Sequence, residues 1–254
     1  MSTTMTDGYS ERQRIEKQYH DDKYRDHAES GTAGNIKRAF AGFWSLISQA
    51  HNETVLDFGC GSGWMSIALA KLGNRVHSFD ISEVLVGRAR QAAEAAHVAD
   101  RITFREMAGE HLDFPSETFD MVVGSAVLHH TDLDAALTSI RRVLKPHGRA
   151  IFLEPLNQNP ALAAWRRLTP WRRSDTERAF TRADLATVLR FFPSARLTFY
   201  CLTSIVTVGL QLAMPNSRVI SYLNDRLDDL DERLLAAFPS LGRFSAVVLL
   251  DMRK

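Results

Sequence analysis

The glycine-rich segment at residues 55–63 is the part of the sequence with the clearest chemistry. It is an apolar run that leads directly into three alternate glycines, Gly59, Gly61 and Gly63. Glycines permit a tight strand-to-helix turn and let a ligand lie against bare backbone. Open α/β sheets bind cofactors at the carboxyl edge, where such a turn lies. We therefore predict a cofactor-binding site at this turn.

Asp80 is the predicted partner of this turn. It follows Gly59 by 21 residues at the end of the next expected strand, where a carboxylate can accept two hydrogen bonds from a ribose. The competing interpretation is that Asp80 only helps Ser82 to cap the following helix. A ribose fits a nicotinamide dinucleotide as well as S-adenosylmethionine. The glycine pattern favours the latter, because Asp57 precedes it and Trp64 stands where dinucleotide packing prefers a small residue.

A second group of reactive side chains follows two later strands. His129 and His130 come after one expected strand and Glu154 ends the next, so all three reach the same sheet edge as the glycines. An imidazole with a pKa of about 6.5 is a competent base at neutral pH, and a nearby carboxylate can fix which ring nitrogen carries the proton. We predict His129, His130 and Glu154 as catalytic residues. The alternative is a structural cap beside a solvent-facing histidine.

Short apolar runs alternate with segments of helical period, and this alternation positions these groups. It predicts strands at residues 54–58, 75–79, 102–106, 119–124 and 149–153, with helices at 64–72, 83–97 and 131–144 between them. Thr131 with Asp134 is expected to open the last of these helices. Further on, a helix at 181–192 opened by Thr181 and Asp184, strands at 195–200 and 245–252, and a helix at 218–238 are expected. The pattern is typical of a parallel sheet with crossover helices.

The order of motifs over residues 50–155 resembles the class I S-adenosylmethionine-dependent methyltransferases that act on small molecules. Besides Asp57 and its glycines, the marks are LDFPSETFD at 112–120, SAVLHH at 125–130 and LKPHGR at 144–149. The resemblance implies an α/β, Rossmann-like fold with a seven-stranded sheet of order 3-2-1-4-5-7-6. In that fold the last strand is antiparallel, helices cover both faces, and a helical cap is added. The implied cofactor is S-adenosyl-L-methionine.

The resemblance also implies which residues bind the cofactor. They are Tyr19, Asp57, Gly59, Cys60, Gly61, Gly63, Asp80, Ile81, Ala108, Gly109 and Ser125. Asp57 and Gly59 would lie near the amino-acid end, Asp80 at the ribose and Ile81 against the adenine. The sequence departs from the family at Ala108, where relatives often carry an acidic residue. Backbone atoms of Ala108 and Gly109 are expected to take over that contact.

Four segments are expected in the chain. They are an N-terminal helical lid at 1–50, a cofactor-binding core at 51–155, a cap insertion at 156–180 and a C-terminal part at 181–254 with cap helices at about 203–240. Within the lid, Gln18–Asp21 resembles the segment that folds over the cofactor, and Tyr19 and His20 are its candidates. The alternative is a loosely packed, solvated helix.

Two tryptophans and four arginines alternate in residues 165–173, inside the cap insertion. Arginine and tryptophan together bind anionic groups by bidentate hydrogen bonds and stacking. We therefore predict Trp165, Arg172 and Arg173 as acceptor-binding residues. The alternatives are contact with acidic lipid headgroups or RNA, or pairing with the five acids of residues 221–240.

The composition limits the classes of partner. The 31 basic and 30 acidic residues nearly cancel, so no overall field draws the chain to nucleic acid. The two cysteines, Cys60 and Cys201, are too few for a disulfide framework or metal cluster, and the sequence predicts no metal site. No secretory signal is recognised, and the apolar run at 201–214 is shorter than the roughly 20 residues a membrane span needs. We expect a cytoplasmic protein.

The sequence thus predicts an enzyme that moves the methyl group of S-adenosylmethionine to O, N or C of a small, partly apolar metabolite. Three alternatives stay open. They are a membrane-associated methyltransferase of a lipid quinone or prenyl acceptor, an RNA or protein methyltransferase, and a non-catalytic cofactor-binding protein. The charge balance disfavours RNA as a substrate. The lack of an Asn-Pro-Pro-Tyr-like motif after the fourth strand argues against methylation of base amino groups in nucleic acids. A membrane surface is possible but not favoured as a partner, and a homodimer is also possible.

Overall fold

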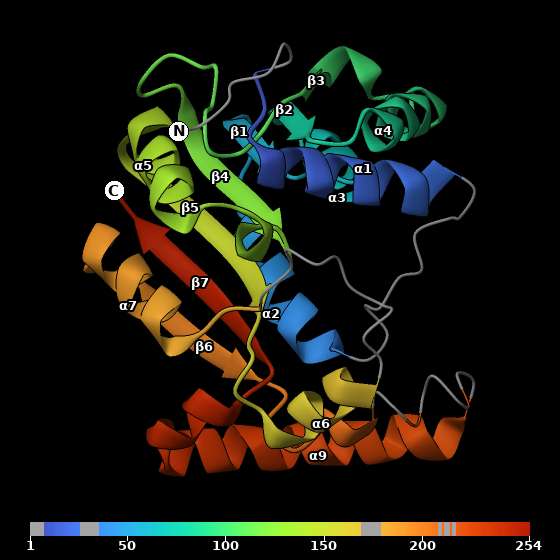
Figure 1. Ribbon diagram of the computed structural model, residues 1–254, viewed down its shortest axis with the longest axis vertical. Helices are drawn as coiled ribbons and strands as arrows, with labels where there is room; N and C mark the ends of the chain where they lie inside the picture. The colour runs from blue at the N-terminus through green and yellow to red at the C-terminus, as the bar shows by residue number, and fades with distance from the viewer. Residues whose placement is uncertain (1–7, 26–35, 169–178, 208–209, 211–213, 215–216) are drawn as a thin grey trace.

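The computed structural model describes residues 8–25, 36–168, 179–207, 210, 214 and 217–254. Its centre is a seven-stranded sheet of order β3-β2-β1-β4-β5-β7-β6 (Figure 1). The strands are β1 Thr54–Phe58, β2 Arg75–Asp80, β3 Ile102–Glu106, β4 Phe119–Ser125, β5 Leu144–Pro155, β6 Arg196–Tyr200 and β7 Val247–Arg253. β7 runs antiparallel to both β5 and β6. The strand order and the antiparallel last strand confirm the predicted fold.

The register of the central strands gathers their carboxyl ends at one edge. β1 pairs in parallel with β2 and β4, with Asp57 opposite Ser78 on one side and Val123 on the other. The segments that follow Phe58, Asp80 and Ser125 therefore leave the sheet side by side. This common edge carries the glycine loop and most of the predicted site residues.

Helices cover both faces of the sheet. The bounds are α2 Lys37–Ile47, α3 Trp64–Lys71 and α4 Glu83–Ala95 on one face, and α5 Leu133–Val143 and α7 Arg182–Phe191 on the other. Successive strand residues point to opposite faces, so Val55 packs in the cluster that contains Phe43, while Leu56 packs in the cluster that contains Leu137. The two resulting cores fix the sheet rigidly beneath its functional edge.

The predicted helix starts are confirmed in two cases and wrong in one. Ser82 Oγ accepts a hydrogen bond from the amide of Leu85, and Thr181 and Asp184 form a complete capping box. At α5, however, the cap is Asp132, whose side chain accepts from the amide of Ala135. Thr131 is not free for this role, because its hydroxyl donates to the carbonyl of Leu128 at 2.8 Å.

Helix α1 (Glu11–Arg25) lies across the carboxyl edge of the sheet next to α4 (Figure 1). Most of its residues are polar, and Glu16 is its one buried residue. Polar groups of the sheet edge, rather than an apolar core, therefore hold α1 in place.

Helices α6 (Pro160–Leu168) and α9 (Arg218–Ala237) both lie at the far end of the molecule from α1 (Figure 1). The buried carboxylate of Asp231 anchors α9 by accepting from the amides of Leu202 and Thr203, each at 2.8 Å. Arg38 of α2 pairs with Asp229 and Glu232 of the same helix. Three of the acids in residues 221–240 are thus bound by α2 and by the loop after β6.

No helix within the described residues combines the length and apolar character that a membrane crossing requires. The three-residue turns η2 (Ala99–Arg101) and η3 (Leu128–His130), together with η5 (Pro239–Phe244), complete the described elements.

Candidate active site

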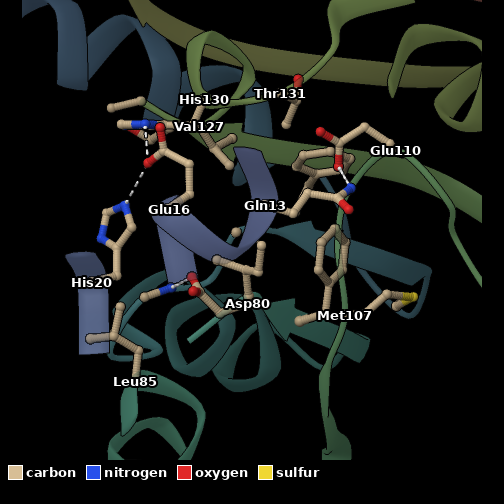
Figure 2. Close-up of a pocket in the computed structure, with 18 of the residues that line it drawn as sticks. Gln13, Glu16, His20, Asp80, Leu85, Met107, Glu110, Val127, His130 and Thr131 are labelled. Atoms are coloured by element: carbon tan, nitrogen blue, oxygen red, sulfur yellow. Dashed lines mark hydrogen bonds and ion pairs between the residues drawn. The ribbon is translucent and has the colours of Figure 1, made fainter. Parts of the chain in front are cut away.

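A cavity of about 260 Å³ lies at the carboxyl edge, between α1 and the ends of β1, β2 and β4 (Figure 2). Its walls come from five segments: α1, the glycine loop, the β2–α4 junction, the loop after β3 and the turn after β4. The lining residues are Gln13, Glu16, His20, Tyr24, Phe58, Gly59, Gly61, Phe79, Asp80, Ile81, Leu85, Met107, Gly109, Glu110, Ser125, Ala126, Val127, His130 and Thr131.

The glycine loop forms the floor of this cavity. Gly59 and Gly61 line it, with φ angles of 73° and 52° that favour glycine. A Cβ atom on Gly59 would lie 2.3 Å from Val127 Cγ2, so a side chain there would also collide with the opposite wall. Gly63 has another task, since its added Cβ would meet Ala89 Cβ at 2.9 Å. It lets α3 and α4 pack closely and does not line the cavity.

Asp80 joins the loop to the next helix. Its Oδ2 accepts from the amide of Gly61 at 2.9 Å and its Oδ1 accepts from the amide of Ser82 at 3.0 Å. The same carboxylate forms part of the cavity wall. Asp80 therefore makes the contact that the helix-capping interpretation predicts, and ribose binding at the cavity wall stays a prediction.

Asp57 lies beneath the loop and does not line the cavity. Its Oδ2 accepts from the Ser66 hydroxyl, and Ser66 also bonds to Ser78 at 2.8 Å. Among the described residues, its buried Oδ1 has no hydrogen-bond partner. Burial, helped by the nearby charge of Asp80 and opposed by the Ser66 hydrogen bond, raises the pKa of Asp57 to about 7. The structure therefore makes Asp57 a support of the loop.

The remaining predicted cofactor residues divide into two groups. Ile81, Gly109 and Ser125 line the cavity. Cys60 and Ala108 are buried behind its wall, with exposed fractions of 4% and 8%. Their side chains contribute packing, while Gly109 is required because an added Cβ would lie 2.2 Å from the Phe58 ring.

One face of α1 forms the roof. Gln13, Glu16, His20 and Tyr24 point to the cavity from this helix (Figure 2). Tyr19 was predicted to face the cofactor, but its side chain does not line this cavity. Tyr19 borders a separate outer groove with Ile15 and Lys23, because neighbouring helix residues are rotated by about 100°.

One row of polar side chains on α1 fastens the helix to the sheet edge. Gln13 Nε2 donates to Glu110 Oε2 at 2.9 Å, and Lys17 Nζ donates to Glu106 Oε1 at 2.8 Å. Asp21 Oδ1 accepts from the hydroxyl of Ser82. The residues 13, 17 and 21 are spaced by four, so one row of the helix carries all three contacts.

The two predicted histidines have different surroundings. His129 is buried and does not line the cavity; its Nδ1 lies 2.8 Å from Glu154 Oε2. Glu154 Oε1 accepts from the amides of Val127 and Leu128 at 3.0 and 2.9 Å. His129 and Glu154 thus build the turn after β4, and the structure does not place them at the cavity. His130 does line it.

The carboxylate that faces His130 is Glu16 of α1. His130 Nδ1 lies 3.1 Å from Glu16 Oε2, and His20 Nε2 lies 3.7 Å from the same oxygen (Figure 2). Burial, together with the charge of His130, lowers the pKa of His20 to about 4, against the raising effect of Glu16. His20 is therefore a neutral imidazole at physiological pH.

The predicted acceptor-binding residues are not brought to this cavity within the described part of the chain. Trp165 belongs to α6 at the far end of the fold. Arg172 and Arg173 lie outside the described residues.

Several lining residues were not predicted, chiefly Gln13, Glu16, Met107 and Glu110. Glu16 lies one helical turn before His20, so the helical period could have found it once His20 was placed inward. Glu110 is two residues beyond Ala108, and no pattern in the sequence shows which residue of that loop faces the cavity.

Comparisons with known proteins agree with this arrangement. Residues 56–152 match the family model described as a methyltransferase domain. A demethylmenaquinone methyltransferase from Lactiplantibacillus plantarum is 40% identical over 112 residues, 42% of this chain and 47% of that protein. A ubiquinone biosynthesis O-methyltransferase from Rhizobium etli is 34% identical over 111 residues, 43% of this chain and 44% of that protein. The chain therefore matches less than half the length of these curated relatives.

A solved structure shows the same fold over nearly the whole chain. Magnesium protoporphyrin IX methyltransferase from Synechocystis, with bound S-adenosylhomocysteine, superposes with a TM-score of 0.59 at 18% identity. The match covers 96% of this chain and 100% of that one. The sheet order, the glycine loop and Asp80 define the class I methyltransferase fold. Residues 56–152 match a methyltransferase domain, and the chain has the fold of a solved methyltransferase.

The cofactor of this family is S-adenosylmethionine, and the residues present fit it. The bare backbone of Gly59 and Gly61 and the carboxylate of Asp80 lie in one wall. Apolar side chains of Ile81 and Met107 stand next to them. This combination suits the polar amino-acid and ribose parts and the apolar adenine of one ligand.

Proposed function

We propose that this protein is a methyltransferase that uses S-adenosylmethionine to methylate a small, partly apolar molecule. One observation carries the proposal: the cavity combines the glycine loop and Asp80 with an opposite wall that holds Glu16 and His130. The first pair suits the cofactor. The second suits an acceptor whose proton must be removed.

The proposed cofactor contacts follow from the wall residues. Asp80 would accept from the ribose hydroxyls, and Ile81 and Met107 would contact the adenine. The backbone of Gly59 and Gly61 would lie against the amino-acid part. Asp57 would act through the loop that it supports, and the lid role of residues 1–50 would fall to α1 as its roof.

The chemistry needs few protein groups. When bound, S-adenosylmethionine supplies a methyl group on a sulfonium, an excellent leaving group. The protein must hold the acceptor atom in line and take up its proton where it carries one. Because Glu16 lies at Nδ1 of His130, that carboxylate would hold the Nδ1–H tautomer and leave Nε2 of His130 as the base.

The named relatives support a particular class of acceptor. Two of them act in menaquinone or ubiquinone synthesis by their names, which suits an aromatic acceptor with a hydroxyl or an activated ring carbon. The apolar part of the wall, with Val127 and Leu85, suits the ring. The alternative function, methylation of a lipid quinone at a membrane surface, requires the same chemistry. Its acceptor would differ only in carrying a long prenyl tail.

Calorimetric titration with S-adenosylhomocysteine tests the cofactor half of the proposal. Wild-type protein is expected to bind with a micromolar dissociation constant, and Asp80→Ala to bind at least tenfold more weakly. Asp113→Ala is the matched control, because the Asp113 side chain is 98% exposed. No binding by the wild type would overturn the proposal.

Methyl transfer from labelled S-adenosylmethionine to a panel of phenols, quinols and prenylated quinols tests the acceptor half. Transfer to the short-chain compounds supports a small acceptor, and transfer only to prenylated ones in vesicles supports the lipid alternative. Cofactor binding without transfer to any acceptor would support the non-catalytic alternative instead. A cytoplasmic location and a homodimer remain predictions from the sequence.

A further inference from the structure

Glu16, His20 and His130 form a cluster of three potential metal ligands in the roof and wall of the cavity. One oxygen of Glu16 and one ring nitrogen of each histidine lie within 4.8 Å of one another. Glu16 and His20 share one face of α1, and His130 comes from η3 after β4 (Figure 2). The cluster thus joins the roof helix to the sheet edge.

The spacing of these atoms is close to that of ligands around one ion. Metal–ligand distances of about 2.0–2.2 Å place neighbouring ligand atoms roughly 3.0–3.5 Å apart. The Glu16 Oε2–His130 Nδ1 distance is 3.1 Å and the Glu16 Oε2–His20 Nε2 distance is 3.7 Å. The nitrogens of His20 and His130 lie within 4.8 Å of each other, so a shift of the His20 side chain toward Glu16 and His130 would complete the arrangement.

The surroundings also favour a cation. Glu16 is 3% exposed, and a buried carboxylate is stable only when it is paired or bound to a metal. The Nδ1 atom of His20 is buried and has no hydrogen-bond partner within the described residues. The side chain is thus held next to Glu16 without the full set of hydrogen bonds that a purely structural imidazole normally makes.

We propose that Glu16, His20 and His130 bind a divalent transition-metal ion such as Zn²⁺, and that its open positions take an oxygen of the acceptor. Two imidazoles and one carboxylate are a common ligand set for such ions, and three protein ligands leave coordination positions free. The ion would replace the direct Glu16–His130 contact at Nδ1 of His130. With the ion bound, Nε2 of His130 would carry the ring proton, so the ion would take over the role proposed for His130 as the base and the acceptor proton would pass to water. This inference rests on the proposed function for the acceptor, but metal binding itself does not.

The proposal narrows the acceptor class. A metal-bound hydroxyl group loses its proton more readily than a free one, so the acceptor would be a phenol, an enol or a vicinal diol. Glu16 balances one of the two positive charges, and the ionised acceptor oxygen balances the other. Methylation would then occur on that oxygen or on the ring or enol carbon that its ionisation activates, whereas an amine without a neighbouring hydroxyl gains nothing from the ion.

Titration with ZnCl₂ followed by calorimetry is the direct test, on the full chain and without cofactor. Wild type is expected to bind one ion with a dissociation constant in the micromolar range or below. His20→Ala and Glu16→Gln are each expected to weaken binding by at least 30-fold. His51→Ala, which removes an exposed histidine at the opposite edge of the sheet, should stay within twofold of wild type.

The visible absorption of bound Co²⁺ tests the metal site in the wild-type protein, without any variant. Co²⁺ in a site of two histidines, one carboxylate and water should produce visible absorption bands in the wild type. Those bands should shift on addition of catechol, the probe for an oxygen chelator. Absent bands, or zinc binding equal in wild type and His20→Ala, would overturn the metal site.

The failure of this proposal can be separated from that of the proposed function. Titration with S-adenosylhomocysteine on the same preparations reports cofactor binding alone. Retained cofactor binding with no metal binding would leave the methyltransferase proposal in place and reject only the ion.

Discussion

Glu154 and His129 form a buried pair whose Oε2 and Nδ1 atoms lie 2.8 Å apart. The other oxygen of Glu154 accepts from two consecutive amides of the same turn. One carboxylate at the end of β5 therefore fixes the conformation of the turn after β4. The adjacent residue, His130, is held at the cavity as a result.

Glu154→Ala is expected to lower the free energy of unfolding by about 3 kcal/mol, because three buried donors lose their acceptor. Urea denaturation measures the loss. Glu94→Ala, which removes an exposed glutamate of α4, should change stability by less than about 0.5 kcal/mol. A loss below about 1 kcal/mol for Glu154→Ala would contradict the structural role.

His130→Gln is expected to lower the turnover of an identified acceptor by about 10²-fold or more, because the imidazole proposed to assist removal of the acceptor proton is lost. Binding of S-adenosylhomocysteine should stay within threefold of wild type. His129→Gln serves as the comparison. It should reduce thermal stability while the turnover of the folded fraction changes much less. Equal turnover defects with equal stability would remove the distinction between the two histidines.

Gln13→Ala combined with Lys17→Ala is expected to loosen the roof helix, because the Gln13–Glu110 and Lys17–Glu106 contacts disappear. The dissociation constant for S-adenosylhomocysteine should rise about three- to tenfold, and hydrogen exchange across residues 11–25 should become faster. Lys23→Ala changes the outer face of the same helix and is the control. Unaltered exchange in the double variant would show that α1 is held by other contacts.

Asp57→Asn is expected to change how stability depends on pH. The pKa of Asp57 is raised to about 7 in the folded protein, against about 3.9 in the unfolded chain. The folded state therefore prefers the protonated form, and the stability that this preference contributes at low pH is lost as pH rises from about 4 to about 7. The asparagine variant cannot ionise and should lose less stability over that range.

Urea denaturation of both proteins at pH 4, 6 and 8 measures this effect. The difference in unfolding free energy between variant and wild type should move by roughly 2–4 kcal/mol in favour of the variant between pH 4 and pH 8. Ser66→Ala removes the hydrogen bond that holds the pKa of Asp57 down. The stability of this variant should therefore fall more steeply with rising pH than that of the wild type. Parallel pH profiles for wild type and Asp57→Asn would exclude Asp57 as the source.

Ala108→Asp is expected to give at most a threefold gain in affinity for S-adenosylhomocysteine. The Ala108 side chain is buried behind the wall, and the carboxylate of Glu110 already lies in the cavity. A gain above tenfold by calorimetry would show that an adenine contact is missing after all. Glu110→Ala should weaken the binding of S-adenosylhomocysteine, because it removes the carboxylate that is already present in this wall.

Much of the fold was predictable because the signals are local. The runs at 54–58 and 102–106 became strands with the predicted bounds, and the β-branched, apolar pattern of a buried parallel strand is strong. The helix start at 131 was wrong because two adjacent polar residues, Thr131 and Asp132, both suit a cap. Which one serves depends on the turn that precedes them.

The site was predictable where backbone geometry defines it and less so where side chains meet across the fold. Gly59, Gly61 and Asp80 follow from one strand–turn–helix unit. The Glu16–His130 contact joins residues 114 positions apart, and no spacing rule reaches that far. The choice between His129 and His130 depends on a single turn that rotates one ring into the core and its neighbour into the cavity.

The glycine loop and α1 form different walls of the cavity, and this arrangement affects how the choice of acceptor could evolve. The loop and Asp80 belong to the segment shared with the relatives, while α1 precedes residue 56, where that segment begins. Substitutions at the positions of α1 that face the cavity would change its roof and leave the residues of the glycine loop and Asp80 as they are. Under the proposed function, the choice of acceptor could therefore vary through the cavity-facing positions of α1 while the sequence of the glycine loop and Asp80 stays the same.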